Sequence, residues 1–166
     1  MKLQDLRLAC DRIDETLSKK FCELVDLKSH IIILGNGGSN AVASHIAQDY
    51  TKKLGKQSFT FSDPSRLTCY INDYGMQFAN LQFLKEFSHK ESLVILISSS
   101  GNSENMLHCA EFCQKNGIDF AILTGFDKNN KLRKNYSNSA ILDFWVDSCD
   151  YGVVECTHQV FLHVPA

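Results

Sequence analysis

The sequence predicts an α/β fold, in which a parallel sheet is covered by helices on both faces. Short, uninterrupted apolar segments such as HIIIL (30–34) and SLVILI (92–97) are typical of strands that are buried on both sides of a sheet. Segments with helical spacing of apolar residues lie between them, and this alternation favours parallel strands joined by helices. In addition, two strands run directly into small-residue turns, GNGGS (35–39) and SSSGNS (98–103).

The chain is expected to begin with one amphipathic helix over residues 3–27, where apolar side chains recur at helical spacing between charges. Besides the two strands already quoted, three further strands are expected, at 57–61, 119–125 and 140–146. Helices are expected at 40–55, 76–89, 103–117 and 152–164, with a short polar helix or loop at 128–135. The segment SDPSRLTCYINDYG (62–75) predicts a turn, a short helix and a loop.

Length and composition exclude several classes of protein. The 166 residues fit one domain, and neither a repeat nor a linker divides them. A formal net charge of −2 gives no general attraction to nucleic acid or to a membrane surface. No apolar run is long enough to span a bilayer, and the charged start lacks a signal peptide. Seven cysteines without a CxxC pair fit reduced thiols, so a cytoplasmic location is expected.

The two small-residue turns suit a phosphate group. Each lies at a strand end that leads into a helix, where glycine permits close approach and free N–H groups and serine hydroxyls can bind an anion. Neither turn has the dinucleotide pattern or the P-loop pattern. The alternative is that both are plain turns with capping serines. Because SSSGNS holds more hydroxyls than one cap can use, a phosphate site formed by Ser98, Ser99, Ser100 and Ser103 is favoured.

Taken together, GNGGS with a following His, NDYG (72–75) and ISSSGNS (97–103) resemble the sugar isomerase (SIS) domain family, and most closely its phosphoheptose isomerases. The resemblance runs from about residue 30 to residue 163 and implies a flavodoxin-like three-layer sandwich. It also implies a single SIS domain over 1–166, with residues 1–28 used in oligomerisation. By the family pattern, the substrate would be bound at Asn36, Gly37, Gly38, Ser39, Asp73, Ser98, Ser99, Ser100 and Ser103. Asp73 could equally be a turn residue.

Two imidazoles and two carboxylates are candidates for a metal site. His45 and Asp49 are four residues apart and share one helix face, whereas Glu155 and His163 are eight apart and could still converge. From spacing alone, a solvated helix pair is the simpler interpretation. The resemblance favours a metal, since it implies zinc ligands at His45, Asp49, Glu155 and His163. Two positions depart from the family pattern, because Asp49 replaces Glu and Glu155 replaces Gln.

The resemblance implies an aldose–ketose isomerase that acts on sedoheptulose 7-phosphate in bacterial heptose synthesis, for lipopolysaccharide or capsule. Moving a proton between C1 and C2 needs a base, an acid and a cation near the developing enediolate. The family implies Asp49 as the base, His163 as the acid, one zinc ion per subunit and a homotetramer. Two alternatives remain open: a non-catalytic SIS protein that binds phosphosugars or a replication initiator, and an isomerase of another ketose phosphate. No nucleic-acid or membrane partner is expected.

Overall fold

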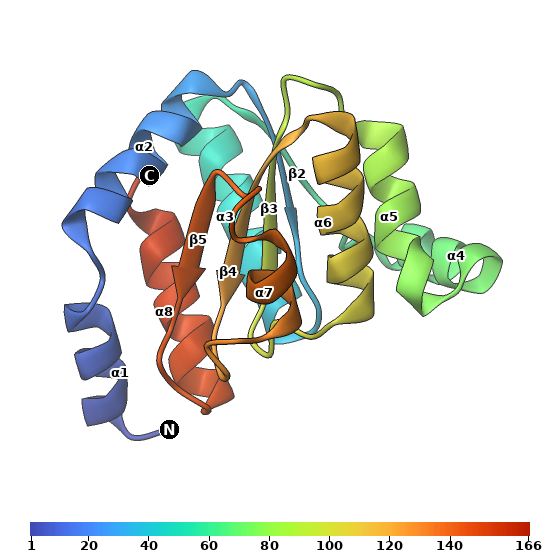
Figure 1. The fold of residues 1–166 in the computed structure, drawn as a ribbon. Coiled ribbons are helices and arrows are strands. Elements are labelled where there is room, and N and C mark those ends of the chain that lie inside the picture. The colour runs from blue at the N-terminus through green and yellow to red at the C-terminus, as the bar shows by residue number, and fades with distance from the viewer.

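A computed structural model describes the whole chain, residues 1–166. Its centre is a five-stranded parallel sheet with the strand order β2-β1-β3-β4-β5 (Figure 1). The strands are β1 (His30–Leu34), β2 (Gln57–Thr60), β3 (Leu93–Ser98), β4 (Asp119–Thr124) and β5 (Leu142–Trp145). This order is that of flavodoxin-like folds, which confirms the predicted three-layer architecture.

Eight helices surround the sheet. They are α1 (Leu3–Asp11), α2 (Glu15–Leu27), α3 (Gly38–Leu54), α4 (Pro64–Tyr74), α5 (Met76–Phe87), α6 (Glu104–Asn116), α7 (Lys131–Tyr136) and α8 (Tyr151–His163). Helices α2, α3 and α8 pack on one face of the sheet, and α5, α6 and α7 pack on the other. Helix α4 packs on α5 and extends outward at the edge of the molecule (Figure 1).

The central strands are fully buried because both of their faces meet helices. In β1, Ile31 and Ile33 contribute to the core under α3 and α8, whereas Ile32 and Leu34 contribute to the core under α5 and α6. Successive side chains of a strand point to opposite faces, so an uninterrupted apolar run supplies both cores at once. No helix of the structure combines the length and the apolar character needed to cross a membrane.

The N-terminal segment differs from the expectation of a single helix over 3–27. The structure has two helices there, and they are separated at residues 12–14. Asp14 begins the second helix as its N-cap, since its side chain accepts a hydrogen bond of 2.7 Å from the backbone N–H of Leu17. The apolar periodicity continues across the break, and for that reason it hid the break from the sequence analysis.

The two small-residue turns lie next to each other at one edge of the sheet. Strands β1 and β3 are hydrogen-bonded neighbours, and each ends in one of the turns. The chain leaves β1 to one side, toward β2, and β3 to the other, toward β4, so the strand order reverses between them. Open α/β sheets bind ligands at such a point, outside the carboxyl ends of the strands.

Candidate active site

A small cavity opens between the two turns. It has a volume of about 120 Å³ and is lined by Asn36, Ser39, Ile97, Ser98, Ser99, Ser100, Ser103, Tyr151 and Glu155. We refer to it as the serine-lined cavity. Every serine that the sequence analysis proposed for phosphate binding lies in its wall, as does Asn36.

The hydroxyl groups of this wall retain capacity for a ligand. The Ser99 hydroxyl is buried and has no hydrogen-bond partner within the chain. Ser98 donates to Ser103 at 3.2 Å, and Ser103, the N-cap of α6, leaves the backbone N–H groups of that helix uncapped by its side chain. The Ser99 hydroxyl is therefore free to form a hydrogen bond with a ligand in the cavity.

Two glycines shape the wall on the α3 side. Gly37 precedes the helix with φ +54°, a backbone conformation that other residues rarely adopt. Gly38 faces α8, where a side chain at this position would collide with the Glu155 carboxylate. The N-terminus of α3 also has no side-chain cap, so its first N–H groups remain available to an anion.

Asn36 is held by the amide side chain of Asn105, which Asn80 holds in turn, and the sequence analysis identified neither residue. Asn36 exchanges two hydrogen bonds with Asn105 of α6, at 3.0 and 2.8 Å, and Asn105 also donates to Asn80 of α5 at 2.8 Å. Asn80 and Asn105 are buried. The sequence did contain a signal for these residues. Asn80 and Asn105 stand at helix positions that apolar periodicity assigns to the core, and a buried polar side chain needs a hydrogen-bond partner.

An aromatic pair stands beside the cavity and was also missed. Tyr151, the first residue of α8, lines the cavity and packs edge-on against Phe126, with ring centroids 4.7 Å apart. Phe126 is the one non-glycine residue with positive φ, at +54°. Its backbone N–H donates to Ser148 and that of Gly125 donates to Ser99, so this loop is tied to the cavity wall.

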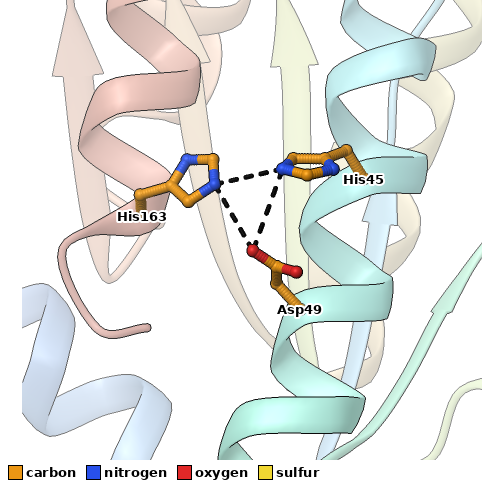
Figure 2. Close-up of side chains that lie close together, drawn as sticks. All are labelled: His45, Asp49 and His163. Carbon is orange, nitrogen blue, oxygen red and sulfur yellow. Dashed lines mark hydrogen bonds and ion pairs between the residues drawn. The ribbon is translucent and has the colours of Figure 1, made fainter.

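Three of the four proposed metal ligands come together between α3 and α8. Figure 2 shows His45 and Asp49 of α3 pointing toward His163 of α8. The Nε2 atoms of the two histidines are 3.2 Å apart, and Asp49 Oδ2 lies 3.8 Å from His45 Nε2 and 3.5 Å from His163 Nε2. We refer to these residues as the His45–Asp49–His163 cluster.

The donor atoms of this cluster fit a zinc ion. Ligands about 2.0–2.1 Å from a tetrahedral ion lie roughly 3.3 Å from one another, close to the separations observed. His163 Nδ1 is 2.8 Å from the Gln159 carbonyl oxygen, so Nδ1 carries the proton and Nε2 presents its lone pair to the cluster. Three protein ligands with a fourth position open are typical of catalytic zinc sites.

Asp49 also has a partner outside the cluster. Lys53 Nζ donates to Asp49 Oδ2 at 2.9 Å, and this hydrogen bond lowers the pKa of the Asp49 carboxyl. The charge of Lys53 and the two neighbouring imidazoles lower it further, against an opposing effect of burial. Asp49 is therefore ionised at neutral pH, which suits a metal ligand better than a strong base.

Glu155 is not part of the cluster, contrary to the predicted ligand set. It precedes His163 by eight residues on one helix, which corresponds to about 12 Å along the axis. That separation places its carboxylate at the serine-lined cavity, beside Gly38, where burial raises its pKa. The prediction that Glu155 and His163 bind one ion took account of the angle between them around the helix and neglected the rise along its axis.

Asp73 lies apart from the site, contrary to the expectation that it binds sugar hydroxyls. NDYG is not a loop after the short helix, since its first three residues form the last turn of α4. Asp73 is exposed there and interacts only with Cys69 and Asn72 of the same helix. It does not line the serine-lined cavity.

The cavity and the cluster lie along the same two helices. On α3, His45 follows Ser39 by six residues, about 9 Å along the helix axis. On α8, His163 follows Glu155 by eight residues, about 12 Å along the axis. A molecule with its phosphate in the cavity and its other end at the cluster must therefore be several carbon atoms long.

Comparison with known proteins places this arrangement in context. No family model matches the chain. A phosphoheptose isomerase of Cytophaga hutchinsonii is 36% identical over 107 residues, which are 61% of this chain and 56% of that protein. A phosphoheptose isomerase of Fusobacterium nucleatum is 28% identical over 155 residues, 90% of this chain and 77% of that protein. The chain thus matches little more than half of the Cytophaga protein's length.

Solved structures share the fold. The phosphoheptose isomerase of Neisseria gonorrhoeae has a TM-score of 0.84 at 22% identity, over 96% of this chain and 89% of that one. The NanR protein of Vibrio vulnificus, in complex with ManNAc-6P, has a TM-score of 0.68 at 18% identity, over 98% of this chain and 55% of that one. By sequence and by fold, the chain is similar to phosphoheptose isomerases, which is the resemblance that its motifs predicted.

Proposed function

We propose that the chain is an aldose–ketose isomerase of phosphosugars, and that it converts sedoheptulose 7-phosphate to D-glycero-D-manno-heptose 7-phosphate. The observation that carries this proposal is the placement of a hydroxyl-lined cavity and a metal-ligand cluster along the same pair of helices. Phosphoheptose isomerases are also the relatives that the sequence matches. Heptose synthesis for lipopolysaccharide or capsule is the corresponding role.

The length of the substrate fits the site. An extended seven-carbon sugar phosphate measures on the order of 9 Å from phosphorus to C1, given carbon–carbon bonds of about 1.5 Å. This is close to the distance along α3 between Ser39 and His45. With the phosphate held by Ser39, Ser98, Ser99, Ser100 and Ser103, C1 and C2 would reach the His45–Asp49–His163 cluster.

Each group of the cluster has a role in this proposal. A zinc ion bound by His45, Asp49 and His163 would supply positive charge beside the sugar oxygens at C1 and C2. Asp49 would take the proton from carbon, and His163 would give a proton to oxygen. The Gln159 carbonyl holds the ring proton of His163 on Nδ1, so Nε2 would carry and give a proton only while it is not bound to the zinc ion.

The low pKa of Asp49 limits how well it can act as a base. Lys53 shares the oxygen Oδ2 with the cluster, so Asp49 must release one of these partners before it accepts a proton. We therefore expect a slow enzyme whose rate depends on the Lys53 contact.

The proposal is tested by NMR of sedoheptulose 7-phosphate incubated with zinc-loaded protein. Aldose signals should appear with the wild-type chain, and Asp49→Asn should reduce the rate at least about 100-fold, the usual contribution of a general base. Asp73→Asn is the matched control, because Asp73 is exposed and lies outside the site.

Two results would contradict the proposal. Unchanged turnover in Asp49→Asn would remove the proposed base. Binding of the sugar phosphate without any turnover would instead favour a phosphosugar-binding module, a class that the fold of the NanR protein also serves in its complex with ManNAc-6P.

A further inference from the structure

The serine-lined cavity contains no positive charge. Its nine lining residues include neither lysine, arginine nor histidine, and its one carboxylate is Glu155. A phosphate dianion in this cavity would be held by hydroxyl and N–H groups alone, next to a like charge. Such a pair is unfavourable, because two charges in a poorly hydrated site interact more strongly than in water.

Glu155 is not neutralised by any other part of the chain. Its side chain is half-buried, and burial is the one influence on its pKa, with no hydrogen bond or nearby charge contributing. By contrast, the neighbouring acid on α8's N-terminus, Asp150, caps the helix and binds the amino group of Met1. A half-buried carboxylate without a partner is costly unless a ligand supplies a donor.

The position of Glu155 determines which part of a ligand it meets. Its carboxylate lies against Gly38, where the absent side chain leaves space, and so it faces the α3 side of the same cavity as the serines. A group bound there lies within a few atoms of the phosphate. In a sugar phosphate, the groups at that distance are the hydroxyls on carbons next to the phosphorylated carbon.

We propose that Glu155 is a specificity-determining residue, which accepts a hydrogen bond from a ligand hydroxyl near the phosphate and so selects hydroxylated phosphate esters over simple ones. This inference rests on the phosphate-binding part of the proposed function, and it does not require turnover. A phosphate ester without such a hydroxyl experiences only the repulsion between its phosphate and the Glu155 carboxylate. A hydroxylated ester also forms a charge-assisted hydrogen bond with Glu155, which offsets that repulsion.

The test uses two small esters of equal charge, glycerol 1-phosphate and n-propyl phosphate, titrated calorimetrically into the full chain with EDTA present. The wild-type chain should prefer glycerol 1-phosphate. In Glu155→Gln, affinity for n-propyl phosphate should rise about tenfold as the repulsion is lost. Affinity for glycerol 1-phosphate should rise less or fall, so the preference between the two esters should drop at least about fivefold.

Glu104→Gln is the matched control. Glu104 begins α6 directly after Ser103, is exposed, and does not line the cavity, so it removes one negative charge nearby without touching the ligand. It should leave the preference unchanged. A thermal unfolding curve of each variant verifies that the fold is intact, so that a lost preference can be assigned to Glu155.

Three outcomes would overturn the inference. The first is an unchanged preference in Glu155→Gln. The second is wild-type binding that requires a divalent cation, which would make Glu155 a cation ligand. The third is that neither ester binds to any variant, which would remove the phosphate site itself. Failure of the isomerase proposal is separate, because it would appear as absent turnover of sedoheptulose 7-phosphate while the ester preference persists.

Discussion

Lys53 is the residue whose replacement most directly probes the His45–Asp49–His163 cluster. Its ammonium group donates to the same Asp49 oxygen that faces the two histidines. Replacing Lys53 with Gln removes a positive charge that competes with a cation for this oxygen. Zinc affinity should rise about tenfold, as measured by competition with a chromophoric chelator.

Lys52→Gln is the control for this prediction. Lys52 neighbours Lys53 in the sequence and is exposed, and no ion pair links it to Asp49. Equal zinc affinities in the two variants would show that the general charge of α3 matters and that the specific contact with Asp49 does not.

His158 makes stability depend on pH for a different reason. It is fully buried and contacts the Thr124 carbonyl oxygen, and desolvation lowers its pKa to about 4. Its ordinary pKa is 6.5, so between pH 6.5 and pH 4 the unfolded chain binds a proton that the folded chain does not. The stabilisation is present above pH 6.5 and is lost as pH falls to about 4, by roughly 3 kcal/mol.

Urea unfolding across this pH range measures the effect. The His158→Asn variant should be less stable at pH 7, yet its free energy of unfolding should fall less between pH 6.5 and pH 4. Parallel pH profiles for the two proteins would mean that other groups dominate the acid sensitivity, with His30 the first to consider, because burial lowers its pKa as well.

Among the helices, α2 depends on a single cap for its start. The Asp14 side chain accepts from the Leu17 backbone N–H, and Ser18 adds a bond to the Asp14 carbonyl oxygen. Asp14→Ala should lower the free energy of unfolding by about 1 kcal/mol, as measured by urea denaturation. Asp14→Asn retains an acceptor and should restore most of the loss, whereas equal losses in both variants would indicate that the charge is what matters.

The comparison of sequence and structure is clearest at the scale of these elements. Uninterrupted apolar runs predicted β1, β3 and β4, because a strand that is buried on both faces has apolar residues at successive positions. The edge strands β2 and β5 were also expected, although only part of each is buried. The break at Asp14 was missed, since apolar spacing continues through it. The NDYG segment was mistaken for a loop, because Gly75 marks the end of α4 and the residues before it are helical.

Part of the candidate site was also predictable from the sequence. Residues in the two turns were identified correctly as neighbours, because the carboxyl ends of adjacent parallel strands must meet. The position of Asn105 depends instead on distances between helices, which spacing within one segment does not give. The position of Glu155 follows from the rise along α8, which the prediction neglected. Asp49 and Glu155 depart from the family pattern, and only the fold shows which groups surround their carboxylates.

For the molecule as a whole, we expect a homo-oligomer, and specifically a tetramer, in line with the resemblance. Helix α1 has no buried residue, and its Leu3 and Leu8 are 78% and 47% exposed. Uncovered leucines on an amphipathic helix favour contact with a second copy. The double variant Leu3→Glu, Leu8→Glu should therefore reduce the molecular mass measured by light scattering.

Gln4→Glu is the matched control for assembly. Gln4 is exposed between the same leucines, and its replacement adds one negative charge, against two in the double variant, without a loss of apolar surface. Its molecular mass should equal that of the wild-type chain. A wild-type monomer would contradict the prediction, and an oligomer that tolerates the double variant would place the interface elsewhere.

The contact between α3 and α8 also has a consequence for the stability of the chain. His45 and His163 are 118 residues apart, and the Tyr50 hydroxyl donates to the Leu162 carbonyl oxygen at 2.7 Å between the same two helices. An ion bound to both histidines would close a loop of nearly three quarters of the chain, and so it would act as a reversible cross-link. The metal content of the surroundings would then govern how long the protein survives proteases and heat, as well as how fast it works.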